Sequence, residues 1–265
     1  MDVQGRVVIV TGGANGIGRA LCLALKKARA RHVFVADLDE SSAQEVAGAI
    51  RGTAVRCDVA NEAEIQQLVR FAESECGRVD IFVSNAGVTA KGGPEVPDEE
   101  WQRLWNVNLM SHVYAARAVL PGMLQRGAGY LVQVASAAGI LTEIGSAPYS
   151  VTKHAVVSFA EWLSVHYQQQ GIRVSCVCPA GVATDFLDLD DPVHQFLHFS
   201  AVTPEELATT VLDGIRQERF LIVSHEELHE FFAFKSTDYD RWLKNFAHLH
   251  KKIQRQTERK EKTSA

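Results

Sequence analysis

Three side chains in the segment 136–153 could together move a proton to or from an alcohol, namely those of Ser136, Tyr149 and Lys153. The apolar spacing predicts a helix that begins near Pro148 and carries both Tyr149 and Lys153. Residues four positions apart on a helix lie on one face, so these two side chains can act on one small volume. The same pair also occurs by chance on amphipathic helices, so it needs a second site to be informative.

The phenol of Tyr149 needs a partner to act near neutral pH, because a free tyrosine has a pKa of about 10. Lowering that pKa by about three units takes roughly 4 kcal/mol. A lysine ammonium at about 4 Å, with an effective dielectric constant of about 20, stabilises a phenolate by about 4 kcal/mol. We therefore expect Lys153 to lower the pKa of Tyr149, and Ser136 to hydrogen-bond the substrate oxygen.

The first 27 residues predict a phosphate-binding unit, since Arg6 to Val10 indicate a strand that a glycine-rich turn connects to a helix. Glycines allow close backbone approach and the free amides of a helix N-terminus attract anions, so the unit fits a pyrophosphate. Its spacing is GxxxGxG, and glycine turns also occur where strands simply meet helices. The residues of the turn that we expect to contact the cofactor are Gly12, Asn15, Gly16, Ile17 and Gly18.

A carboxylate at the end of the second predicted strand narrows the choice of ligand to a dinucleotide. Asp37 lies 19 residues after Gly18, where dinucleotide-binding folds place an acid against the adenosine ribose. Neither Asn15 nor Leu38 is basic, so the 2′-phosphate of NADP would meet negative charge without a partner. We predict NAD as the cofactor, with Asp37 and Leu38 beside it. Alternatively Asp37 caps the next helix, a role that Asp39 or Ser41 could fill instead.

Strands and helices alternate along the chain, which is typical of a doubly wound parallel sheet whose ligands bind beyond the carboxyl ends of the strands. We predict a single-domain α/β Rossmann fold over residues 1–250, with a mostly seven-stranded parallel sheet and helices on both faces. The third and fourth predicted strands end at residues that we expect near the cofactor: Asp58, Val59, Asn85, Ala86 and Gly87.

Composition excludes several classes of protein. The 265 residues are 46% hydrophobic, enough for a large core, and a net charge of −5 gives no reason to expect nucleic acid. No apolar run approaches the roughly 20 residues of a membrane span, and the start lacks a basic signal-peptide region. The five cysteines and the histidines lack metal-ligand spacing. We predict a cytoplasmic protein with reduced thiols and no metal.

These motifs resemble the short-chain dehydrogenase/reductase family over nearly the whole chain. TGGANGIG at 11–18 matches the family's TGxxxGxG turn, SNAG at 84–87 is similar to its NNAG, and Ser136 and YSVTK at 149–153 match its serine and YxxxK. The resemblance implies that Lys153 also contacts the nicotinamide ribose. It further implies an active-site asparagine holding a water chain, which we assign to Asn108 rather than Asn106.

The segment PAGVATD resembles the family's PGxVxT, which borders the nicotinamide. This implies cofactor contacts from Pro179, Val182 and Thr184, while Ala180 departs from the usual glycine. Residues 185–202 occupy the place of the family's substrate lid. Their apolar side chains favour a hydrophobic substrate, although phenylalanines in a loop more often pack on the core. The residues that we expect to contact substrate are Ser136, Ile140, Tyr149 and Phe186.

The resemblance implies an NAD-dependent oxidoreductase that interconverts a secondary alcohol and a ketone, of steroid, retinoid or lipid type, with Tyr149 as general acid/base. One alternative is another nicotinamide reaction on this scaffold, such as enoyl reduction or epimerisation. The resemblance disfavours it, because enoyl reductases of this kind usually separate the tyrosine and lysine more widely than YxxxK. A catalytically idle NAD-binding sensor or interaction protein is the alternative from another class. The family is usually dimeric or tetrameric, and we expect the same here through the helices around Asn108 and Tyr149, including Val156, Val157, Phe159 and Trp162.

The sequence after His225 predicts two helices whose aromatic residues pack on the core, close the substrate pocket or contact another subunit. Residues 251–265 carry a net charge of +4 and have no hydrophobic period. We expect them to be a solvated, frayed terminus; binding of an acidic partner is the alternative.

Overall fold

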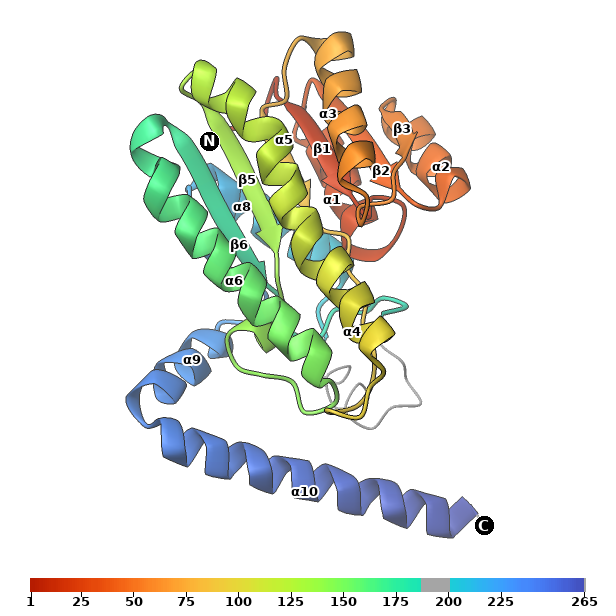
Figure 1. Cartoon of the computed structure of the whole chain (residues 1–265), viewed down its shortest axis with the longest axis vertical. Coiled ribbons are helices and arrows are strands. Elements are labelled where there is room, and N and C mark those ends of the chain that lie inside the picture. The colour runs from red at the N-terminus through yellow and green to blue at the C-terminus, as the bar shows by residue number, and fades with distance from the viewer. Residues whose placement is uncertain (187–200, 265) are drawn as a thin grey trace.

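The computed structural model describes residues 1–186 and 201–264, with side chains described as far as residue 255. In this part of the chain, seven parallel strands form one sheet in the order β3-β2-β1-β4-β5-β6-β7 (Figure 1). The strands are β1 (Val7–Thr11), β2 (His32–Asp37), β3 (Thr53–Arg56), β4 (Ile81–Ser84), β5 (Gly129–Val134), β6 (Ile172–Cys178) and β7 (Leu221–Val223). The predicted doubly wound fold is confirmed.

The central strands are buried on both faces, which explains why they are continuous apolar runs rather than alternating ones. Successive side chains of a strand point to opposite faces, so β1 contributes to two cores. Val7 and Ile9 lie in the core beneath α3, α5 and α6, whereas Val8 and Val10 lie in the core beneath α1, α2 and α8.

Helices cover both faces of the sheet (Figure 1). They are α1 (Gly16–Lys27), α2 (Glu40–Ile50), α3 (Glu62–Cys76), α4 (Asp98–Trp105), α5 (Ser111–Gln125), α6 (Ala147–Tyr167) and α8 (Pro204–Arg216). A π-helical turn, η1 (Asn106–Met110), joins α4 to α5, and two 3-10 turns, η2 (Ala137–Gly139) and η3 (Gln168–Gln170), follow β5 and α6. All the site elements described below meet at the carboxyl ends of the strands.

The chain ends in two helices, α9 (Glu227–Thr237) and α10 (Tyr239–Ser264). Both lie at the end of the molecule toward which β5 and β6 run (Figure 1). Residues 251–264, for which we predicted a solvated, frayed terminus, form the end of α10. Gln, Arg, Glu and Lys dominate this stretch and are good helix formers, and extending an existing helix costs far less than nucleating one.

Candidate active site

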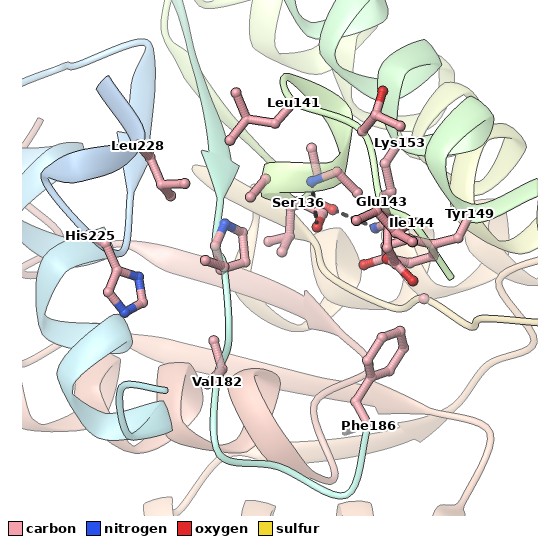
Figure 2. Close-up of a pocket in the computed structure, with 18 of the residues that line it drawn as sticks. Ser136, Leu141, Glu143, Ile144, Tyr149, Lys153, Val182, Phe186, His225 and Leu228 are labelled. Carbon is pink, nitrogen blue, oxygen red and sulfur yellow. Dashed lines mark hydrogen bonds between the residues drawn. The ribbon is translucent and has the colours of Figure 1, made fainter. Parts of the chain in front are cut away.

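A cavity of about 1030 Å³ opens at the carboxyl edge of the sheet. Its walls come from the glycine turn, the ends of β4, β5 and β6, the start of α6, and α9 with α10. Figure 2 shows Ser136, Tyr149 and Lys153 on one side of the cavity and His225 and Leu228 on the other. The residues that the sequence singled out for chemistry therefore share one space.

Two hydroxyl-capped turns position Ser136 and Tyr149. The Ser146 side chain caps α6 by accepting a hydrogen bond from the Tyr149 amide at 3.1 Å, which starts the helix immediately before Tyr149. Ser136 precedes η2, and its Oγ accepts from the Ala138 amide at 3.1 Å. Ser136 acts on Tyr149, since its side chain favours the ionised form of the phenol and so lowers its pKa. The serine and the phenol thus face the same point of the cavity, as Figure 2 also shows.

Lys153 lies one turn after Tyr149 and is almost completely buried. Its Nζ donates to the carbonyl oxygen of Val134 at 3.0 Å and lies 5.6 Å from the centroid of the Tyr149 ring. The carbonyl at the end of β5 therefore fixes the ammonium behind the phenol. The sequence contained no signal for Val134, because its contribution comes from the backbone.

Burial controls the pKa values of this pair. It raises the pKa of the Tyr149 phenol above its ordinary value, although the hydrogen bond with Ser136 acts in the opposite direction. It also lowers the pKa of Lys153 to about 8. Burial thus opposes the predicted lowering of the pKa of Tyr149 by Lys153, because desolvation of the phenol is the largest effect on that pKa.

The π-helical turn η1 places Asn108 in the same region. Asn108 is fully buried, and its side chain binds Val88 twice, accepting from the amide at 2.8 Å and donating to the carbonyl at 2.9 Å. Its Nδ2 also lies 3.1 Å from Thr152 Oγ1 on α6. Asn106, in contrast, accepts a hydrogen bond from exposed Gln102. The geometry favours Asn108 over Asn106, and single-turn π-bulges are common at functional sites.

Gly87 separates Asn108 from Lys153. A Cβ added to Gly87 would lie 3.4 Å from Lys153 Nζ and 3.5 Å from Asn108 Oδ1. A side chain at Gly87 would therefore enter the space between the asparagine and the lysine. This packing gives a physical reason for the glycine that closes the SNAG segment.

The glycine turn has the shape of an anion site. Gly12 and Gly16 have positive φ values of 62° and 51°, and a Cβ on Gly18 would lie 1.9 Å from the Gly12 carbonyl oxygen. Asn15 makes no side-chain hydrogen bond to cap α1. Asn15, Gly16 and Ile17 all line the cavity, so the first turn of α1 directs its N-terminus into it. These residues fit a dinucleotide pyrophosphate.

Asn85 supports this turn with its side chain. Its Nδ2 donates to the carbonyl oxygens of Thr11 and Gly12 at 3.0 and 3.1 Å, and its own amide donates to Thr11 Oγ1 at 3.0 Å. Asn85 and Ala86 line the cavity beside the turn. The Asn85 side chain therefore holds the end of β4 against the glycine turn.

Asp37 lies at the end of β2, as predicted. Its carboxylate accepts from the amides of Ala14 at 3.0 Å and Asp39 at 3.1 Å. Asp39 is the N-cap of α2 and accepts from the Ser42 amide. Asp39 fills the capping role, so capping does not account for Asp37.

The other predicted adenosine-side residues surround the ends of β2 and β3 but not the cavity itself. Leu38 is exposed, and Val59 is buried in the core. The Asp58 carboxylate accepts from the Ala60 amide at 2.9 Å, which shapes the turn after β3.

The segment after β6 forms a further wall of the cavity, beside the glycine turn. Pro179, Val182 and Thr184 line the cavity, as does Ala180, whose amide donates to Ser224 Oγ at 2.9 Å. A Cβ on Gly16 would lie 3.2 Å from Thr184 Cγ2, so this segment approaches the first turn of α1. The segment resembling PGxVxT is therefore next to the glycine turn despite alanine at position 180.

Phe186 and Ile140 were expected to contact the substrate but to have no other role, and the structure places only Phe186 at the cavity. The Phe186 ring lies 5.7 Å from the Tyr149 ring and lines the cavity (Figure 2). Ile140 does not line it, because its side chain packs in the core beneath α6, and the neighbouring Leu141 and Ile144 line it instead. Most of the expected lid, residues 187–200, lies outside the described residues.

Sequence reasoning missed Lys235 on α9. This lysine is buried, and its Nζ donates to the Ile140 carbonyl at 2.7 Å and lies 3.5 Å from His154 Nε2. A single lysine after the apolar FFAF segment was the available signal. It ties α9 to the loop between β5 and α6.

The aromatic residues of the two C-terminal helices both pack together and line the cavity. Of the three roles considered for these aromatic residues, packing and closing the cavity occur together. Among the described residues, no group of three or more His, Cys, Asp or Glu could hold a metal ion. No described helix is long and apolar enough to cross a membrane.

Fold and site together define a doubly wound dinucleotide-binding protein with a Ser-Tyr-Lys group at the carboxyl edge of its sheet. Residues 6–192 match the family model for short chain dehydrogenases. The chain therefore belongs to the short-chain dehydrogenase/reductase family, and its dehydrogenase relatives support an oxidoreductase that acts on CH–OH groups.

Individual relatives span most of the chain. A 1-deoxy-11-beta-hydroxypentalenate dehydrogenase from Streptomyces exfoliatus is 32% identical over 236 residues, covering 86% of each chain. Human epidermal retinol dehydrogenase 2 is 33% identical over 246 residues, covering 89% of this chain and 79% of the relative. A short chain dehydrogenase/reductase from Burkholderia phymatum, solved in complex with NAD, has a TM-score of 0.83 and 27% identity, covering 91% of this chain and 96% of that one. The cofactor class is accordingly a nicotinamide dinucleotide.

Proposed function

We propose that this protein is an NAD-dependent oxidoreductase that interconverts a hydrophobic secondary alcohol and its ketone. The observation that carries the proposal is the contact of Tyr149 with Ser136, with Lys153 fixed behind it by the Val134 carbonyl. An idle NAD-binding protein could use Lys153 for the ribose, but it would have no need of Ser136 and Tyr149 in the same cavity. Burying an ammonium is costly unless its position serves a purpose.

In alcohol oxidation, Ser136 holds the substrate oxygen while Tyr149 removes the hydroxyl proton. Lys153 stabilises the phenolate and orients the ribose, and Asn108 positions a route for the proton beyond Lys153. A bound nicotinamide dinucleotide supplies the hydride acceptor. In the reverse direction the raised pKa of Tyr149 keeps the phenol protonated, so that it can donate its proton to the carbonyl oxygen.

We assign the pyrophosphate to the glycine turn, the adenosine to Asp37, Leu38, Asp58 and Val59, and the nicotinamide to the segment after β6. The preference for NAD over NADP rests on Asp37, whose carboxylate would repel a 2′-phosphate. The hydrophobic character of the substrate is supported by Leu141, Ile144, Phe186 and Leu228, which line the cavity near Tyr149.

We also propose a homodimer or homotetramer that assembles through α4 and α6. Four large apolar side chains on these helices are exposed, those of Trp105, Val151, Trp162 and Val165. Exposed apolar groups gathered on adjoining helices are typical of subunit contacts.

The test is NADH formation by the purified protein with NAD and a panel of secondary alcohols from 2-butanol to steroid size. Tyr149→Phe should lower kcat at least a hundredfold, because the general acid/base is lost, while NAD binding changes little. Tyr167→Phe on the same helix is the matched control and should retain activity. Full activity of Tyr149→Phe would refute the assignment, and tight NAD binding without turnover in either direction would favour the sensor alternative.

A further inference from the structure

The cavity extends from the catalytic group to the C-terminal helices. Five residues of α10 line it, and four of them besides Asn245 are apolar: Trp242, Phe246, Leu249 and Ile253. Their spacings of four, three and four residues place them on one face of the helix. At a rise of about 1.5 Å per residue, this face forms an apolar stripe about 16 Å long. The wall opposite the catalytic group is therefore elongated.

The apolar stripe of α10 is partly packed against its neighbours, and part of its surface is still accessible to a ligand. The Trp242 ring lies 5.9 Å from that of Phe234 on α9 and 4.5 Å from that of Phe246. Trp242 and Ile253 are buried, whereas Phe246 and Leu249 are only partly buried. Partly buried apolar residues between two anchored ones can gain contacts from a ligand.

Lys235 fixes the two helices to the catalytic wall. Its buried ammonium binds the carbonyl of Ile140, immediately before cavity-lining Leu141, and approaches His154, immediately after Lys153. The Tyr239 ring at the start of α10 lies 5.5 Å from the same ammonium. The distal wall is thus held in register with Tyr149 and Lys153 by a buried contact.

The charges that line the cavity favour apolar ligands with a neutral tail over those that carry an anionic group. Among the described lining residues Lys153 is the only lysine or arginine, whereas Glu143, Asp185 and Glu227 are carboxylic acids. A substrate that carries its own carboxylate or phosphate would meet like charge and no second lysine or arginine among the described lining residues. A neutral tail meets no such penalty.

We infer that α9 and α10 form a distal subsite that selects neutral, elongated, apolar secondary alcohols and ketones. The reacting carbon lies at Tyr149 and the tail lies along the stripe of α10. This inference rests on the proposed function for its catalytic end. It adds that recognition depends on the length of the tail and on the absence of charge from it.

The experiment compares kcat/KM for 2-butanol, 2-decanol and 9-hydroxydecanoate, which is 2-decanol with a carboxylate at the far end. The full chain should prefer 2-decanol to both others by at least tenfold. Phe246→Ala and Leu249→Ala should each lower kcat/KM for 2-decanol by about tenfold, and that for 2-butanol by less than twofold. Leu243→Ala, which alters an exposed residue of α10 outside the stripe, is the control and should match the parent protein.

Equal losses of kcat/KM for 2-butanol and 2-decanol in Phe246→Ala and Leu249→Ala would indicate a merely structural role and overturn the subsite. Equal kcat/KM of the parent protein for 2-decanol and 9-hydroxydecanoate would also overturn it. Calorimetric binding of 2-decanone in the presence of NAD tests the subsite without turnover. Binding that weakens in Phe246→Ala but not in Leu243→Ala supports it, and unchanged binding refutes it. Turnover of 2-butanol that vanishes in Tyr149→Phe, without any preference for length, would overturn the subsite while leaving the proposed function intact.

Discussion

Tyr149 and Lys153 lie in the same low-dielectric surroundings, and burial moves their pKa values in opposite directions, that of the phenol up and that of the ammonium down. The phenol becomes harder to ionise, and the pKa of the ammonium falls to about 8. Burial thereby disfavours the charged form of each group, which is costly for stability and useful for proton exchange. The Val134 carbonyl offsets part of that cost by binding Lys153 Nζ.

This arrangement predicts how Lys153 affects stability as pH changes. Lys153 has a lower pKa folded, about 8, than unfolded, about 10.5, so between these values the unfolded chain binds more protons and stability rises with pH. The penalty is fully present below pH 8 and amounts to about 3 kcal/mol. From pH 7 to 10.5, the free energy of unfolding of the parent should therefore rise by about that amount relative to Lys153→Met.

Urea denaturation of both proteins without cofactor measures this difference, and other titrating groups cancel between them. Exposed Lys244 on α10 provides the control, since Lys244→Met should differ from the parent by a nearly constant amount across the range. A constant difference for Lys153→Met as well would show that the ammonium carries no burial penalty.

A second single residue, Asp37, determines the choice between NAD and NADP in our proposal. Asp37→Asn keeps an oxygen that can accept from the Ala14 amide but removes the charge that a 2′-phosphate would meet. The ratio of kcat/KM for NAD to that for NADP should fall tenfold to a hundredfold. Asp39→Asn is the matched control, because it removes a neighbouring charge from the cap of α2 and should leave the ratio nearly unchanged. Equal use of both cofactors by the parent protein would contradict the role of Asp37.

At the scale of elements, the sheet and its order of strands and helices were predictable from the sequence because each buried strand is a continuous apolar run bounded by turn residues. The glycine turn and the Tyr-Lys spacing were predictable for a different reason, because both depend only on the local geometry of a few neighbouring residues. Asn108 could be assigned only by resemblance, because its position depends on a π-helical turn without a clear sequence signal. The structure then accounts for the choice through Val88 and Thr152.

The elements that sequence reasoning described least well are those whose structure depends on distant partners. Ile140 looked like a substrate contact, but its side chain turns into the core while its carbonyl binds Lys235, 95 residues later in the chain. The charged end of α10 looked frayed because its composition lacks a hydrophobic period. The apolar stripe that precedes it is complete at Ile253, and its function becomes visible only when β5, α6 and α9 are in place.

At the scale of the molecule, α6 has two distinct faces. Tyr149, Lys153 and Val156 lie on the buried face, so Val156 belongs to the core rather than to a subunit contact as expected from the sequence. Trp162 and Val165 lie on the exposed face, where the Trp162 ring stacks on His166 at 3.8 Å. An assembly that covers this face would hold the catalytic helix between the sheet and a second subunit.

Trp162→Glu should therefore shift the protein from dimer or tetramer to monomer in sedimentation velocity, since a buried unpaired carboxylate at a subunit contact costs several kcal/mol. Leu243→Glu places the same charge on an equally exposed apolar residue of α10 and should leave the assembly intact. A parent protein that sediments only as a monomer would refute the assembly. If the contact also steadies α6, the Trp162→Glu monomer should melt at a lower temperature than the Leu243→Glu protein while retaining Tyr149-dependent turnover below that temperature, because Trp162 lies outside the cavity and changes none of its walls.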